Sequence, residues 1–352
     1  MSVTLSDVAK VAGVSIKTVS RVVNNQGEVS KETRERVMEA VEKLGYHPNI
    51  LARGLVMQRT YTLAIVSWGL DQYPPSRFVM GVAREADEQG YSVLLTLLRS
   101  STNDKPDLVI NSLVSRQVDG IIWQAPRVGN NQSWIVPERL AKLPPVVINS
   151  LPNPNVTTVS IDNYHGGVVA MQHLVEQGWK TIGIITGWME HPMSQERLRG
   201  WRDVLEGNHL ECDPSLIVHG DWTVKGGDEA MEILLKRRPD IDAVFSSNDT
   251  MALGAMRAAQ RNGRIICRDL GVIGYENHPE SAYFSPPLST IHQPVFELGR
   301  EAVRLLVKLI EKNSHGERPV KPELVVYKPE LVIRQSSLRC SSSNLNEGRK
   351  DD

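Results

Sequence analysis

The chain has 352 residues, which is about twice the length of a typical single domain and predicts two or three folded units. Hydrophobic residues make up 41% and charged residues 23%, and these fractions exclude a disordered chain and a coiled-coil rod. The formal net charge is −1, but residues 1–60 hold nine Lys/Arg against six Asp/Glu and carry +3, so the remainder carries −4. A basic head on an acidic body is typical of a modular nucleic-acid binder, although ordinary surface charge explains so modest an asymmetry equally well.

The sequence shows no feature of an exported or membrane protein. Residues 1–10 enter a polar helix pattern without the basic and apolar regions of a signal peptide, and no later stretch is apolar over about 18 residues. The cysteines Cys212, Cys267 and Cys340 lie too far apart for a CxxC motif, and their odd number argues against a disulfide framework. We therefore expect a cytoplasmic protein.

Three short helices are predicted at the start of the chain. A capping box, Thr4-Leu5-Ser6-Asp7, begins the first helix, which ends at Gly13. The second covers residues 16–24 and the third residues 31–44, and each follows a serine that is able to cap it. Their apolar residues recur at helical spacing, so the three helices are expected to share one small core.

The tight turn at residues 12–15 joins the first two helices as in a helix-turn-helix, in which the start of the second helix reads base edges in the major groove. Lys17 and Arg21, four residues apart, would point there together. On spacing alone, a plain helical bundle remains an equal alternative.

Four motifs in this region are far more specific than the spacing. They are Val3-Thr4-Leu5-Ser6-Asp7-Val8-Ala9, Ala12-Gly13-Val14-Ser15, Thr18-Val19-Ser20-Arg21-Val22-Val23-Asn24 and Ser30-Lys31-Glu32-Thr33-Arg34. They resemble the LacI/GalR family of transcriptional regulators, and the likeness continues through residues 44–49 and 52–55 and along the chain to about residue 335.

The resemblance implies which residues contact DNA. Ile16 and Lys17 occupy the two positions that discriminate operators within the family, and Thr33 is expected to contact phosphate. The complete implied set is Leu5, Ser6, Ser15, Ile16, Lys17, Thr18, Ser20, Arg21, Asn24, Ser30, Thr33, Tyr46, Asn49, Ala52 and Leu55.

The family likeness also implies a hinge helix over residues 49–56 that inserts Leu55 into the minor groove as an apolar wedge. Gly54 lies inside this helix, and a glycine there costs about 1 kcal/mol, so the hinge is expected to fold only with DNA and the partner subunit. A plain linker in which Leu55 packs on the body is the alternative.

From Thr62 onward, short apolar strands alternate with longer amphipathic segments, which predicts parallel sheets covered on both faces. The expected strands are Leu63 to Ser67, Val93 to Leu98, Gly120 to Trp123, Val146 to Asn149, Ile182 to Thr186, Ala243 to Ser247 and Leu270 to Gly274. About 270 residues with this rhythm predict two doubly wound lobes. The family resemblance implies lobes like those of periplasmic sugar-binding proteins, with chain crossings near Ser160, Ile291 and Lys321.

Ligands of open α/β sheets collect beyond the carboxyl ends of strands, and polar side chains follow several of the expected strands. Amides, carboxylates and guanidinium groups suit the hydroxyls of a polyol, and an indole suits the C–H face of a sugar. The candidate ligand residues are Arg99, Asn149, Arg197, Trp222, Asn248, Glu276 and Gln293.

Each candidate also has an ordinary structural explanation. Asn248 and Asp249 would cap the next helix, Arg197 would form an ion pair at the surface or between the lobes, and Trp222 would belong to the core. The family resemblance assigns Arg197 and Asn248 to the ligand, whereas residues 162–163 are interpreted as turn and cap residues outside the site.

The chain departs from the family pattern at two places. Glu276 stands where the family commonly has aspartate, and Asn149 stands where a galactoside-responsive member has aspartate. The acceptor pattern therefore differs, so a galactoside ligand does not transfer to this chain. Ile16 and Lys17 likewise prevent the transfer of a known operator sequence.

An α/β enzyme is the rival class, but the sequence lacks GxxxxGK[ST], GxGxxG after the first strand, GxSxG and HExxH. No histidine has cysteine or carboxylate neighbours at metal spacing, so no cofactor and no metal are expected. A stand-alone sugar-binding transport protein does not fit the fused DNA-binding head. We expect a repressor that binds a palindromic operator as a dimer and is controlled by a sugar or related small molecule.

These observations predict a helix-turn-helix head over residues 1–46, a hinge and linker over 47–60, a two-lobed body over 61–335 and a disordered tail over 336–352. The tail lacks the sustained heptads that a tetramerising helix needs. The expected assembly is therefore a dimer made by the body, through the apolar helix around Phe78 to Ala86.

Overall fold

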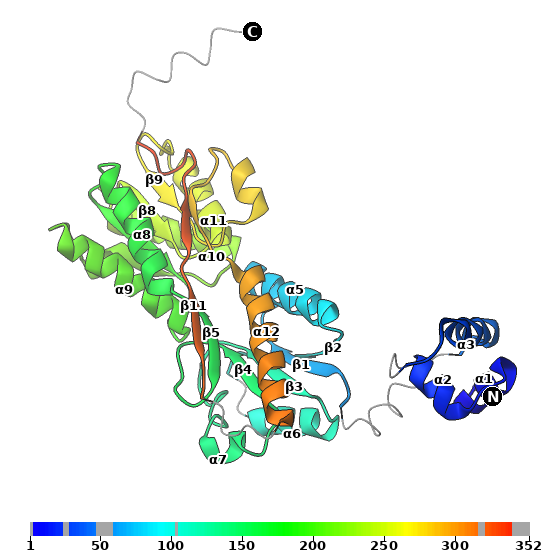
Figure 1. Ribbon diagram of the computed structural model, residues 1–352. Helices are drawn as coiled ribbons and strands as arrows, with labels where there is room; N and C mark the ends of the chain where they lie inside the picture. Colours follow the sequence, from blue (N-terminus) through cyan, green and yellow to red (C-terminus); the bar gives the residue numbers. More distant parts are fainter. Residues whose placement is uncertain (1–2, 24–27, 47–58, 103–104, 316–320, 340–352) are drawn as a thin grey trace, which may run out of the picture. The chain divides into compact units, whose positions relative to one another are not determined.

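The computed structural model describes residues 3–23, 28–46, 59–102, 105–315 and 321–339. The chain divides into two compact units, residues 1–61 and 62–352, which we call the head and the body (Figure 1). The expected hinge helix over 49–56 lies outside the described residues.

Three helices make up the described part of the head, α1 (Leu5–Ala12), α2 (Ile16–Val23) and α3 (Lys31–Leu44). They begin and end at the predicted signals. The Thr4 hydroxyl accepts the Asp7 N–H at 3.4 Å while the Asp7 carboxylate accepts the Thr4 N–H at 3.0 Å. Gly13 ends α1 at φ 65°, in the left-handed region where a glycine avoids strain.

One small core holds the head together. Each helix contributes one completely buried valine to this core: Val8, Val19 and Val37. Tyr46 packs into the same cluster. A core with so few apolar side chains gives this small unit only a small free energy of unfolding.

The body consists of two lobes, each a parallel sheet with helices packed on it (Figure 1). The first lobe has the strand order β11-β5-β4-β3-β1-β2. Its elements are β1 (Thr62–Ser67), α5 (Tyr73–Glu88), β2 (Ser92–Leu97), α6 (Pro106–Ser115), β3 (Gly120–Gln124), α7 (Pro137–Leu140), β4 (Val146–Asn149), β5 (Thr157–Ile161), α12 (Val295–Ser314) and β11 (Leu324–Tyr327).

The second lobe has the strand order β7-β6-β8-β9, and its adjoining two-stranded sheet pairs β10 with β12 in antiparallel fashion. Its elements are α8 (Asn163–Glu176), β6 (Ile182–Thr186), α9 (Pro192–Gly207), the 3-10 turn η1 (Pro214–Leu216), β7 (Ile217–His219), α10 (Val224–Arg237), β8 (Ala243–Ser246), α11 (Asp249–Arg261), β9 (Gly271–Ile273), η2 (Pro279–Tyr283), β10 (Thr290–His292) and β12 (Glu330–Val332). The two doubly wound lobes confirm the predicted fold class.

Within the described residues the chain passes between the lobes after β5, after β10 and between β11 and β12. The first two crossings lie within two residues of Ser160 and Ile291, as expected. The third lies at residues 328–329 and not at Lys321, because β11 still pairs with β5 in the first lobe up to Tyr327. Three neighbouring connections join the lobes, which is the arrangement found in two-domain proteins that open and close about a hinge.

Helices α5 and α12 lie against each other in the first lobe, and their closest approach is backbone to backbone. A Cβ at Gly81 would collide with the Phe296 carbonyl oxygen, and one at Gly299 with the Phe78 carbonyl oxygen. The apolar side of α5, including Phe78, is therefore buried within its own chain. The buried residues of α5 are therefore not available to a second copy. The expected dimer surface over Phe78 to Ala86 stays a prediction, and it would have to use the exposed side of the helix, where Met80 is 52% exposed.

The predicted tail boundary at Ser336 is also wrong. Ser336 and Ser337 are fully buried, and the Ser336 hydroxyl donates to the Val272 carbonyl oxygen at 2.6 Å. Trp179 donates its indole N–H to the Ser337 carbonyl oxygen at 2.8 Å. These residues complete the core of the second lobe, and residues 340–352 lie outside the described residues.

Candidate functional site

The exposed side of α2 is the candidate DNA-reading surface of the head. Val19 and Val22 point into the core, which leaves Lys17 and Arg21 exposed on the other side, and Ile16 is 51% exposed beside them. Two cationic donors and an apolar side chain at the start of a helix are able to reach base edges and a thymine methyl group.

Other residues in the predicted DNA-contacting set take different positions. Ser15 and Ser30 are exposed and cap their helices through the N–H groups of Thr18 and Thr33, at 3.1 and 3.3 Å. The Tyr46 ring is buried in the head core, so it supports the helices instead of presenting its face. Leu5 is partly buried against the same core, and Ser6, Thr18, Ser20 and Thr33 are half-buried. Asn24, Asn49, Ala52 and Leu55 lie outside the described residues.

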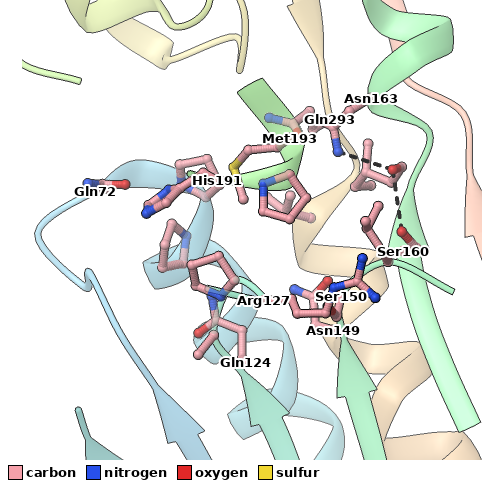
Figure 2. Close-up of a pocket in the computed structure, with 18 of the residues that line it drawn as sticks. Gln72, Gln124, Arg127, Asn149, Ser150, Ser160, Asn163, His191, Met193 and Gln293 are labelled. Carbon is pink, nitrogen blue, oxygen red and sulfur yellow. Dashed lines mark hydrogen bonds between the residues drawn. The ribbon is translucent and has the colours of Figure 1, made fainter. Parts of the chain in front are cut away.

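The body contains a cavity of about 130 Å³ where the carboxyl ends of the strands of both lobes meet. The first lobe contributes Trp68 and Gln124, which follow or end β1 and β3. The second lobe contributes Asn163, His191 and Pro192 from the starts of α8 and α9. Figure 2 shows Gln124, Asn149, His191 and Gln293 among the side chains gathered around this cavity.

The structure brings five of the seven predicted ligand residues to the cavity: Asn149, Arg197, Trp222, Glu276 and Gln293. Arg99 follows β2, is exposed and does not line the cavity. Asn248 is buried behind the wall, where its carboxamide accepts the Met251 N–H at 2.8 Å and donates to the Trp222 carbonyl oxygen at 3.1 Å. Its carboxamide oxygen and nitrogen are thus both hydrogen-bonded to residues of the cavity wall or behind it.

Arg197 is the most firmly held of the cavity side chains. It is only 2% exposed, and Asn163 Oδ1 accepts from its Nε at 3.0 Å and from its Nη2 at 2.8 Å. Its Nη1 donates to the Ser247 carbonyl oxygen, and its Cζ lies 3.6 Å from the centroid of the Tyr275 ring. Three of its five N–H groups are used, so two remain to face a ligand.

Trp222 and Glu276 are held in strained backbone conformations at the cavity, with φ of 72° and 107°. Non-glycine residues adopt such angles rarely, and the strain persists where surrounding structure fixes it, most often at functional sites. The Glu276 N–H donates to the Ile291 carbonyl oxygen at 2.7 Å, which fixes the strained segment against the neighbouring strand.

Three buried polar atoms at the cavity have no hydrogen-bond partner within the described protein: His191 Nε2, Trp222 Nε1 and Gln293 Nε2. Burial lowers the pKa of His191, so its imidazole is neutral near pH 7. The indole and carboxamide nitrogens are donors only, and an unpaired buried donor costs about 1 to 3 kcal/mol. The cavity is therefore suited to a molecule with several acceptor oxygens.

Aromatic rings from both lobes meet beside the cavity. The Trp68 ring of the first lobe lies 6.0 Å from Trp188 and 5.4 Å from His191 of the second lobe, measured between centroids. His191 in turn stacks with Trp222 at 6.3 Å. The second lobe thus touches the first through apolar ring surface at this point.

Sequence reasoning missed Trp68, Gln124, Asn163 and His191. The first two stand at the ends of β1 and β3, so the same strand-end rule that selected Asn149 would have found them. The interpretation of residues 162–163 was half right. Asp162 caps α8 by accepting the His165 N–H at 2.9 Å, but Asn163 holds Arg197 and lines the cavity.

Among the residues that the structure describes, no group of three or more His, Cys, Asp or Glu side chains is arranged to hold a metal ion. In the same described ranges, no helix is both long enough and apolar enough to cross a lipid bilayer.

A helix-turn-helix head on a chain with a two-lobed, cavity-bearing body defines the class of ligand-responsive DNA-binding regulators. Residues 4–49 match the family described as bacterial regulatory proteins, lacI family, and residues 171–337 match a periplasmic binding protein-like domain. The HTH-type transcriptional regulator CelR of Thermobifida fusca is 36% identical over 341 residues, which cover 95% of this chain and 98% of CelR. The chain belongs to the lacI family of bacterial regulatory proteins.

Two solved structures are similar over nearly the whole chain. A complex of the transcriptional regulator CelR with cellobiose has a TM-score of 0.70 and 34% identity, and covers 95% of this chain and 99% of its own. A lac repressor dimer bound to operator and the anti-inducer ONPF has a TM-score of 0.83 and 29% identity, with 96% and 100% covered.

Proposed function

We propose that the protein is a transcriptional repressor that binds a palindromic operator as a dimer and is controlled by a sugar or related polyol in the body cavity. The observation that carries the effector class is the wall of the cavity. It combines two indole rings, two guanidinium groups, carboxamides and one carboxylate. Most of these groups follow strands, whereas Arg197 lies on helix α9. Hydroxyl groups both donate and accept, so a polyol satisfies the two kinds of group at once.

The size of the cavity supports a single ring. Its volume is about 130 Å³, and apolar cavities of roughly 150 Å³ are known to hold one benzene ring. The enclosed part therefore has room for about one six-membered ring but not for all the exocyclic groups of a sugar. A bound monosaccharide, or one end of a disaccharide, would place its ring here and extend beyond the enclosed part. The similar structure of CelR is a complex with cellobiose, a disaccharide, which makes cellobiose the first sugar to try.

The operator part of the proposal rests on the exposed side of α2 and on the family. One recognition helix reads only a few base pairs, and two symmetry-related heads double the recognised sequence. The similar lac repressor structure is a dimer on its operator. Such a protein acts on DNA in the cytoplasm, and its relative CelR is an HTH-type transcriptional regulator.

The first experiment is a thermal-shift screen of mono- and disaccharides, including glucose and cellobiose, with the full chain. A sugar at 100 times its dissociation constant stabilises the folded protein by about 2.7 kcal/mol, which raises the unfolding temperature measurably. A screen in which no polyol stabilises the protein would reject this effector class.

The second experiment links the sugar to DNA. A selection from randomised duplexes identifies the operator, and its affinity is then measured with and without the sugar from the screen. Because coupling between two sites is reciprocal, the operator must change sugar affinity by the same factor as the sugar changes operator affinity. Equal operator affinity with and without sugar would reject control by this cavity.

A further inference from the structure

The carboxylate of Glu276 has a specific partner behind the cavity wall. The Nε2 of His278 donates to Glu276 Oε2 at 2.8 Å, and the two side chains are only 17% and 8% exposed. Glu276 lines the cavity, whereas His278 does not. His278 is therefore placed to orient the carboxylate without touching a bound molecule.

The other face of His278 contacts the opposite lobe. Its ring lies 4.4 Å from the Tyr73 ring between centroids, with a tilt of 37°. Tyr73 is the first residue of α5 in the first lobe, and its neighbours Gln72 and Pro74 line the cavity. A continuous chain of contacts thus runs from the cavity carboxylate to the start of α5.

We propose, building on the proposed function, that His278 is a positioning residue that ties the Glu276 carboxylate to Tyr73 of the opposite lobe, so that effector binding and the contact between the lobes depend on each other. An open hinge separates Tyr73 from His278 and frees the carboxylate to rotate. A closed hinge fixes the carboxylate toward the cavity and leaves its other oxygen to accept an effector hydroxyl. Each event therefore stabilises the other.

The charges around His278 favour its cationic form. Burial lowers the pKa of its imidazole, but the adjacent carboxylate of Glu276, together with Asp249 and Glu280, outweighs this effect and raises it. Asp249 also accepts the backbone N–H of His278 at 2.8 Å, and burial raises the pKa of this aspartate to about 6. The ring of Tyr73 completes the surroundings.

The direction of the pH dependence follows. Below the raised pKa the imidazolium and the Glu276 carboxylate form a charge-assisted hydrogen bond, which is roughly twice as strong as a neutral one. As the pH rises through that pKa, the bond weakens and the carboxylate is held less firmly. Sugar affinity is therefore expected to fall as the pH rises above 6.5 and through the raised pKa, by roughly fivefold to tenfold.

The first test needs no effector. Histidine side-chain resonances of the full chain are followed by NMR from pH 5 to 9, and His278→Gln identifies the resonance of interest. The wild-type resonance should titrate above the ordinary value of 6.5. It should shift to that value or lower in Glu276→Gln and stay in place in the exposed-site control His315→Gln. An unchanged titration in Glu276→Gln overturns the proposal.

The second test measures calorimetric affinity at pH 6 and pH 8 for cellobiose and for glucose. His278→Gln keeps a donor but does not titrate, so it should remove the pH dependence, and Tyr73→Leu should reduce affinity at pH 6. The double variant should lose little more than either single variant, because both break one chain of contacts. Wild-type pH dependence in His278→Gln, or fully additive losses, overturns the proposal.

The two tests separate this proposal from the proposed function. If wild-type protein binds no sugar, the effector class is wrong, while the NMR titration still decides whether Glu276 and His278 are coupled. Melting temperatures of all variants establish that each is folded. Tyr73→Phe keeps the ring and should behave like the wild type.

Discussion

The head and the body hold their functional side chains in opposite ways. Lys17 and Arg21 of the head project from α2 into solvent, and only the valines behind them are fixed by packing. In the body, Arg197 and Glu276 are nearly buried and each is held by named partners. A substitution on α2 therefore alters recognition without disturbing the fold, whereas one in the cavity disturbs neighbours as well.

This difference means that substitutions change operator recognition by the head more easily than effector recognition by the body. An exposed side chain on a stable helix is replaced at small cost, within about 0.5 kcal/mol. Removing a buried guanidinium leaves its hydrogen-bond partners unpaired, which costs several times more free energy of folding. We expect operator preference to vary freely among relatives and cavity contacts to vary in coordinated sets.

The largest predicted effect is at Arg197. Arg197→Ala leaves Asn163 Oδ1 and the Ser247 carbonyl oxygen without their donor and should weaken sugar binding at least a hundredfold, or about 3 kcal/mol. Operator binding should persist and no longer respond to sugar. The matched control is Arg199→Ala on the same helix, since Arg199 is 54% exposed, contacts Glu196 and the Tyr164 ring, and does not line the cavity. Undiminished calorimetric affinity in Arg197→Ala would remove this residue from the site.

The next effect tests whether the head is the weaker unit. Val37 is completely buried, and Val37→Ala should destabilise the head by about 2.5 kcal/mol through lost burial and the remaining cavity. We expect loss of operator binding with sugar affinity unchanged. Met38→Ala, at a neighbour that is 49% exposed, serves as control. Calorimetry should show an earlier head transition, and a common shift of both units would contradict their independence.

A smaller change in free energy is expected at Lys17. Lys17→Ala should change which base pair is preferred, with a loss of discrimination of about 1 to 3 kcal/mol at that position. Thr33→Ala, by contrast, should weaken all duplexes alike if this residue contacts phosphate. A randomised-operator selection reads both outcomes. An unchanged sequence preference in Lys17→Ala would show that this side chain does not read bases.

The smallest effect is expected from the end of the chain. Deletion of residues 340–352 should leave a dimer with unchanged stability, as measured by light scattering and thermal unfolding. Deletion from Ser336 should destabilise the second lobe, since it removes the buried contacts with Val272 and Trp179. A stable tetramer of the full chain at micromolar concentration would contradict the predicted dimer, because two joined dimers would bridge two operators.

Local signals predicted the secondary structure well. Caps and glycines placed the head helices to within one residue, and each of the seven expected strands is present. Strands β5, β7 and β10 to β12 were missed. Strands β7 and β10 to β12 have only three or four residues, which give too little periodicity to recognise. Strand β5 has the sequence TTVSI, in which three polar residues break up the apolar run. The third crossing was misplaced because the short strand β11 was not recognised, and β11 keeps the chain in the first lobe for six residues beyond Lys321, up to Tyr327.

The candidate site was less predictable than the fold. The sequence indicates which side chains follow strands and so share one edge of a sheet. It does not indicate which of these strands end near the crossings between the lobes. Arg99 follows β2, the outermost strand of its sheet, and so it lies away from the cavity. His191 was missed because the loop after β6 has no periodic pattern, and only the folded structure places its ring between Trp68 and Trp222.

The late completion of both lobes has a consequence for biosynthesis. The sheet of the first lobe lacks an edge strand until residue 327 has been made, and the core of the second lobe lacks Ser336 and Ser337 until residue 337. The core of the head, by contrast, is formed among the described residues 3–46. Because domains fold as units during translation, a DNA-binding head emerges from the ribosome well before any effector cavity exists to control it. Ribosomes stalled early on this message would therefore carry nascent heads capable of folding without regulation.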